Sequence, residues 1–138
     1  MTGTDRTARR FPILFTGASH GMRVLGLAPG SCWVELGGES MVVRMGWAFR
    51  MRAPLDSIRA AMPDTGRVLG WGVHGWRGQW LVNGSSDGLV RVEIEPACRA
   101  LMSGLPVQVR VLRVSLVDPD GFIDEVRARM VRPGPDGT

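Results

Sequence analysis

The feature that most constrains the fold of this chain is a strict alternation of apolar and polar residues in several short segments. In residues 90–95 (VRVEIE) and 107–111 (VQVRV), aliphatic side chains occupy every second position, and residues 49–53 (FRMRA) follow the same pattern. Successive side chains of a β-strand point to opposite faces of the sheet, so each segment predicts a half-buried strand. Pro54 and Pro96 follow two of these segments and predict that the strands end there.

Turn-forming residues are frequent and spread along the chain, with 19 Gly and 9 Pro among 138 residues. They separate further strand candidates and together predict about seven short antiparallel strands. The alternation changes phase at Val111-Leu112, which predicts a bulge or a bend. A sheet of this length usually curls to remove its open edges, so we expect a small barrel.

One segment has the signature of a helix. Asp118 is suited to the N-cap, and Pro119 to the first helical position. The apolar residues after them recur at helical spacing and predict a single stripe that packs on the strands: Phe122, Ile123, Val126 and Met130. We therefore expect one C-terminal helix at about 119–131, capping one end of the barrel.

The charge of the chain is concentrated near its ends. The net charge is +4, and residues 1–10 and 127–138 each contribute +2, while the intervening residues sum to zero. We therefore expect a disordered basic tail over 1–10, a single domain over 11–131 and a disordered tail over 132–138. Because no net basic charge remains on the domain itself, a nucleic-acid partner is disfavoured.

Composition also bears on location and chemistry. No segment approaches the ~18 apolar residues of a membrane-spanning helix, and the segment after the first arginines is too short for a secretory signal. The expected location is cytoplasmic, with a peripheral membrane association open. Cys32 and Cys98 have no metal-binding spacing and are expected to be reduced and buried. All 17 basic residues are Arg and there is no Tyr, so mechanisms that need a Lys amine or a Tyr phenol are excluded.

Residues 70–75 (GWGVHG) match the G-x-G-x-x-G spacing of phosphate-binding loops. That motif requires a strand followed by a helix. Strand-forming residues and further glycines follow here instead, so we interpret the stretch as part of a tightly curled sheet. The two histidines, His20 and His74, lack the supporting ligands of a metal site. We expect no cofactor, no metal and no catalysis.

Three segments resemble bacterial pleckstrin-homology-like (PH-like) domains. They are residues 54–58 (PLDSI), which form a joint after a proline, the Leu-Gly-x-Gly hairpin at 69–72, and the helix entry at 115–122 (SLVDPDGF). The resemblance implies a barrel capped by a helix and, in most cases, no catalysis.

The candidate binding residues form two groups. If Phe49, Met51 and Ala53 face inward, Arg50 and Arg52 lie on the outer face about 7 Å apart. Together with Arg44 they are similar to the basic pattern with which some pleckstrin-homology domains hold inositol phosphates. The second group is the tip of the glycine-rich stretch, which we interpret as a contact loop formed by His74, Trp76 and Arg77.

These observations predict a non-catalytic interaction module that binds a protein partner or an acidic membrane surface. Two alternatives remain at this point. The first is a β-barrel that holds a small apolar ligand in its interior. The second is a split-barrel flavin-type oxidoreductase, which is also rich in β-structure and similar in length.

Overall fold

The computed structural model describes residues 8–14, 32–64, 72–76, 78–83 and 87–130, without the side chains of 72–76 and 83. The elements in these ranges are β1 (Arg9–Pro12), β2 (Cys32–Leu36), β3 (Ser40–Met45), β4 (Phe49–Pro54), the 3-10 helix η3 (Leu55–Ser57), β5 (Ile58–Pro63), β6 (Gly72–Trp76), β7 (Gln79–Asn83), β8 (Leu89–Met102), β9 (Leu105–Ser115) and α2 (Pro119–Met130).

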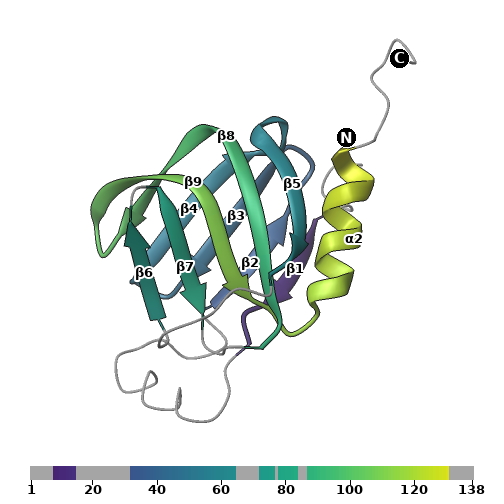
Figure 1. The fold of residues 1–138 in the computed structure, drawn as a ribbon, viewed down its shortest axis with the longest axis horizontal. Helices are drawn as coiled ribbons and strands as arrows, with labels where there is room; N and C mark the ends of the chain where they lie inside the picture. The colour runs from purple at the N-terminus through teal and green to yellow at the C-terminus, as the bar shows by residue number, and fades with distance from the viewer. Residues whose placement is uncertain (1–7, 15–31, 65–71, 77, 84–86, 131–138) are drawn as a thin grey trace.

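The strands form one curled sheet in the order β1-β2-β3-β4-β8-β9-β7-β6, with β5 paired to β8. The sheet bends into a half-barrel, and α2 lies beside it at the end away from β6 (Figure 1). An isolated bridge between Ile13 and Leu116 joins the segment after β1 to the segment after β9. The predicted mainly-β class with one C-terminal helix is therefore confirmed. One detail differs, because β7 pairs with β9 in parallel.

The bend of the sheet depends on β8, which was predicted to end at Pro96. Instead β8 continues to Met102 and pairs with β5 along its first part and with β4 along its second. The register between β8 and β9 shifts between Glu93 and Cys98. This irregularity lets one strand bend and serve both halves of the sheet. It lies opposite Arg110, next to the phase change that the sequence shows at Val111.

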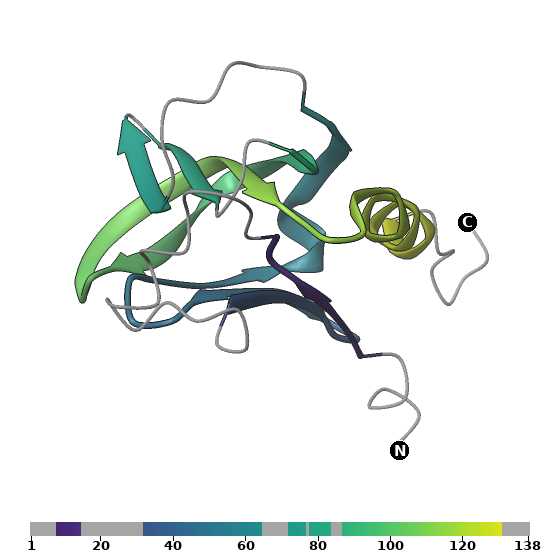
Figure 2. The ribbon, with the colours of Figure 1, turned by 90° about the horizontal axis from the view of Figure 1, so that it is seen from below.

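The inward side chains confirm the alternation that predicted the strands. Phe49, Met51 and Ala53 are buried in β4, and Met41 and Met45 are buried in β3. These residues belong to one hydrophobic cluster enclosed by the two walls of the half-barrel, which Figure 2 shows face to face. Cys32 and Cys98 are both buried and form no disulfide, as expected.

Helix α2 begins where the sequence predicts it. The Asp118 carboxylate accepts a hydrogen bond from the Gly121 amide at 3.0 Å, which is an N-cap contact. Phe122 is fully buried, and its ring meets that of Phe11 edge-on with centroids 5.3 Å apart. The helix packs mainly against β5. The predicted stripe is shorter than expected, because Met130 at the last turn is 39% exposed.

The N-terminal boundary of the domain is also different from the prediction. Arg9 and Arg10, which were assigned to a tail over 1–10, open strand β1 and pair with Leu36 and Glu35 of β2. Their side chains are held by carboxylates, since Arg9 contacts Glu125 and Arg10 contacts Glu35, each at 2.9 Å. The predicted tail over 132–138 lies outside the described residues.

Candidate functional site

The predicted arginines lie on the outer face of the half-barrel. In β4, buried and exposed positions alternate, so Arg50 and Arg52 project outward while their neighbours enter the core. In β3, Arg44 occupies an outward position directly opposite Arg50. The structure therefore brings together all three arginines of the first predicted group.

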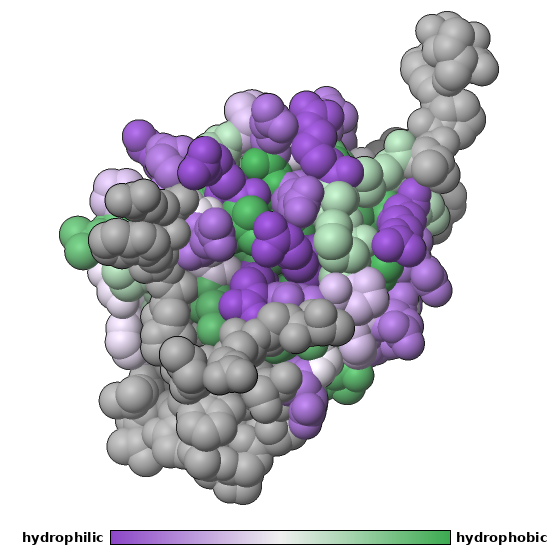
Figure 3. All heavy atoms as spheres, in the orientation of Figure 1, coloured by the Kyte–Doolittle hydropathy of each residue, from purple (hydrophilic) through white to green (hydrophobic). Residues whose placement is uncertain are grey.

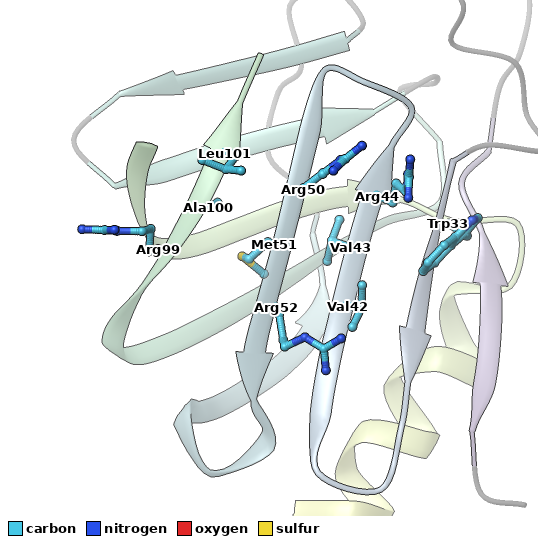
Figure 4. A pocket seen from close by; sticks show the side chains of 10 residues that line it. All are labelled: Trp33, Val42, Val43, Arg44, Arg50, Met51, Arg52, Arg99, Ala100 and Leu101. Atoms are coloured by element: carbon cyan, nitrogen blue, oxygen red, sulfur yellow. The ribbon is translucent and has the colours of Figure 1, made fainter. Parts of the chain in front are cut away.

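Strand register extends this group into a row across four strands. Trp33 of β2 pairs with Arg44, Arg44 pairs with Arg50, and Arg50 pairs with Leu101 of β8. Two residues further along the strands lies a second row, in which Val42 pairs with Arg52. In close-up, these side chains project from neighbouring strands toward the same side of the sheet (Figure 4).

The two rows border a groove of about 530 Å³, which we call the basic groove. Its lining combines four arginines with apolar groups: Trp33, Val42, Val43, Arg44, Arg50, Met51, Arg52, Arg99, Ala100 and Leu101.

Of these lining residues, the sequence analysis named only Arg44, Arg50 and Arg52 as binding candidates, so it missed Trp33, Arg99 and Leu101 on the outer face. Arg99 and Leu101 were missed because β8 was predicted to stop at Pro96. The alternation Cys98-Arg99-Ala100-Leu101, with Cys98 and Ala100 buried, was the signal that could have identified them.

Acidic residues are absent from the two segments that supply the arginines. Residues 40–55 and 96–117 contain six Arg and no Asp or Glu. Among the described residues, no carboxylate lies within 4.0 Å of the guanidinium groups of Arg44, Arg50 or Arg99. Several arginines elsewhere in the described chain do have such partners, for example Arg91 with Glu93 and Arg113 with Asp64.

The edge of the groove toward β1 has a different character. The Arg10 guanidinium lies over the Trp33 ring, 4.0 Å from its centroid, and also contacts Glu35. A second hollow of about 390 Å³ adjoins the groove, shares Val42 and Arg52 with it, and includes Glu35 and Glu39. The charge on this face is therefore positive near Arg44, Arg50 and Arg99 and mixed toward the turn between β2 and β3.

The Arg44–Arg50 pair is electrostatically unfavourable in the isolated protein. Like charges directly opposite each other on neighbouring strands destabilise a sheet. The Cys98 thiol, which lies beneath this face, carries no negative charge that could offset the two arginines. Cys98 Sγ donates a hydrogen bond to the Arg52 carbonyl at 3.0 Å, and burial raises the pKa of Cys98, so the thiol stays protonated at neutral pH.

The second predicted group lies elsewhere in the fold. His74 and Trp76 belong to β6, at the far edge of the sheet, separated from β4 by β8, β9 and β7. Their side chains and the whole of Arg77 lie outside what the structure describes. The backbone supports the interpretation of 70–75 as sheet, because β6 and β7 form an antiparallel pair from Gly72 to Asn83. The earlier glycine, Gly70, is outside the described residues.

In the described part of the chain, no three His, Cys, Asp or Glu side chains come together as metal ligands. No helix within the described ranges has the length and apolarity to cross a membrane. Comparison of the chain with protein-family models, curated proteins and solved structures found no match.

Proposed function

We propose that this protein is a non-catalytic module that docks on the surface of a membrane rich in anionic lipids through the basic groove. The observation that carries the proposal is the cross-strand pair of Arg44 and Arg50. It costs folding stability, and no described carboxylate neutralises it. An external anion would remove that cost, and guanidinium groups match the geometry of phosphate and carboxylate oxygens.

The arrangement of the arginines suits an extended anionic surface. Neighbouring strands lie about 4.8 Å apart, and side chains on one face of a strand about 7 Å apart. Arg44, Arg50, Arg52 and Arg99 therefore form an array that lines the groove over three strands. The array can contact several anionic headgroups at once. Each basic residue near an anionic bilayer contributes about 1 kcal/mol, an attraction that salt screens.

The charge argument against a nucleic-acid partner needs correction. It treated the domain as neutral, whereas the fold gathers arginines of β3, β4 and β8 on one face. A single-stranded nucleic acid would require aromatic faces on which its bases can stack. Among the described residues that line the groove, Trp33 is the one aromatic residue, and the Arg10 guanidinium already covers its ring. We therefore favour a membrane and make a nucleic acid an outcome of the test.

We also propose that the fold is a variant of the PH-like architecture. The support is the combination of a curled antiparallel wall, β1 to β4, with a C-terminal helix that follows the last strand. Of the three segments on which the resemblance rests, the joint at 54–58 forms a 3-10 turn and the helix entry at 115–122 forms a capped helix start. Residues 69–71 of the third segment lie outside the described residues. A helix α2 that is undocked from β5 in solution would contradict this assignment.

The binding proposal is tested by vesicle co-sedimentation with a charge-matched pair of variants. One variant is Arg44→Gln with Arg50→Gln in the basic groove. The control is Arg59→Gln with Arg127→Gln, two exposed arginines on β5 and α2. We expect the native chain to bind phosphatidylcholine vesicles that contain phosphatidylserine and to ignore pure phosphatidylcholine. The groove variant should lose about 2 kcal/mol of binding, roughly a 30-fold weakening, while the control loses far less.

Urea unfolding of the same variants shows whether a loss of vesicle binding is caused by a loss of folding stability. Removing the like-charge pair should leave the groove variant as stable as the native chain, or more stable by about 0.2–1 kcal/mol. Equal loss of binding in both variants would show that net charge alone is responsible and would overturn the proposal. Groove-dependent binding to single-stranded DNA or to polyglutamate, with vesicles ignored, would assign the groove to another class of partner.

A further inference from the structure

Two hairpin tips lie side by side at the end of the molecule opposite α2 (Figures 1 and 2). The first is the turn between β3 and β4, which contains Trp47, and the second is the turn between β8 and β9 at Ser103-Gly104. The Ser103 amide donates a hydrogen bond to the Ala48 carbonyl at 2.9 Å and ties the tips together. Both central residues of the second turn have positive φ, 52° and 85°, as in the tight two-residue turns that suit hairpins.

The tips are apolar where a hairpin at a protein surface is usually polar. Leu105 is 62% exposed, Trp47 54% and Leu101 40%. Leu101 pairs with the exposed Pro106, and Leu105 pairs with Met102, so apolar residues occupy both faces of the β8–β9 tip. A hairpin that packs one face on a hydrophobic core needs apolar residues on that face alone. Figure 3 shows hydrophobic atoms protruding at the margin where Figure 1 places this tip.

Positive charge begins a short distance behind the apolar tips. Arg50 lies opposite Leu101, two residues before the Ser103-Gly104 turn, which corresponds to about 7 Å along a strand. Arg99 is two residues further back. Between Ser40 and Leu55 and between Pro96 and Val117 there is no acidic residue. An apolar end followed by a belt of arginines matches the layers of a bilayer, in which acyl chains lie beneath anionic headgroups.

We propose that the two tips insert into the acyl-chain boundary of the bilayer, with Leu105 and Trp47 as anchors, while the basic groove contacts the headgroups. This inference rests on the proposed membrane docking and adds which end of the molecule faces the bilayer. Amphipathic helices at a membrane interface bury their apolar face by about 5–10 Å, and we assign a similar depth to the tips. That depth would immerse the tips and place Arg50 and Arg44 at the phosphates.

The test places a nitrobenzoxadiazole fluorophore at Leu105→Cys, with Ala128→Cys on the exposed face of α2 as the control position. The native Cys32 and Cys98 are buried, and labelling of the native chain checks that they do not react. Vesicles contain phosphatidylcholine and phosphatidylserine, with or without a lipid that carries a nitroxide on its acyl chain. We expect the label at 105 to shift to the blue and to be quenched by the nitroxide, and the label at 128 to do neither.

The outcomes distinguish this inference from the proposed function. Binding of both labelled chains without a shift at 105 would mean contact through the headgroups alone, and would overturn insertion while leaving docking intact. No binding of the native chain to anionic vesicles would overturn both. A second variant, Leu105→Gln, should weaken binding to the same vesicles about tenfold, because one buried leucine is lost from the bilayer. Unchanged binding of this variant would also contradict insertion.

Discussion

At the scale of single residues, Phe122 is central to the contact between α2 and the sheet. Phe122 is fully buried against Phe11, whereas Met130, eight residues later on the same helix, is 39% exposed. Replacing Phe122 with Ala should lower the free energy of unfolding by about 3–5 kcal/mol, the usual cost of removing a buried aromatic ring. Met130→Ala serves as the control and should cost less than about 1 kcal/mol. Urea unfolding measures both, and similar losses would contradict the docking of the helix described here.

Glu125 makes the stability of the molecule depend on pH. Burial raises the pKa of Glu125, but the hydrogen bonds from Arg9 and Arg129 and the positive charges of these two arginines together outweigh burial and hold that pKa below its ordinary value of 4.5. A carboxyl group with a lowered pKa in the folded state contributes stability above its unfolded pKa, and the contribution disappears as the pH falls through the folded pKa. Glu125→Gln should therefore be less stable than the native chain at neutral pH.

The difference in unfolding free energy between Glu125→Gln and the native chain should shrink as the pH is lowered below 4.5. Urea unfolding at several pH values checks this. A difference that stays constant with pH would show that the carboxylate charge is not involved.

At the scale of elements, two turn glycines with positive φ should respond differently to substitution. A Cβ at Gly88 would collide with the carbonyl of Leu116, whose amide donates to the Gly88 carbonyl at 2.9 Å. A Cβ at Gly104 would meet nothing within 4 Å, so only backbone strain remains there. We expect Gly104→Ala to cost about 1–2 kcal/mol, and Gly88→Ala to cost distinctly more. Equal losses in urea unfolding would contradict the close packing of the β7–β8 turn against the end of β9.

The sequence was sufficient to predict single elements and insufficient to connect them. Alternation identified the inward face of β4, and the Asp118 cap identified the start of α2, because both signals are local. Pro96 was misleading, because a proline usually ends strand pairing, yet here it lies within the irregular stretch where β8 bends. The sequence cannot show that β8 continues and joins both halves of the sheet, since that depends on packing between distant segments.

For the whole molecule, the important property is the distribution of charge. The charges of residues 11–126 sum to zero, and this sum concealed the fact that basic and acidic residues lie partly in separate parts of the chain. The two acid-free segments, 40–55 and 96–117, fold next to each other because β4 pairs with the end of β8. The resulting basic groove was predictable only in part. Arg50 and Arg52 followed from alternation, while Arg99 required the long-range pairing that local patterns do not encode.

The most direct test of the proposed docking is to map which arginines of the native chain contact an anionic membrane. Phenylglyoxal modifies accessible guanidinium groups, and mass spectrometry reports the rate at each site. With vesicles of phosphatidylcholine and phosphatidylserine, we predict that Arg44, Arg50, Arg52 and Arg99 become protected. The exposed Arg59 and Arg127 should react as they do without vesicles. Protection shared equally by all six arginines, or confined to Arg59 and Arg127, would contradict docking through the basic groove.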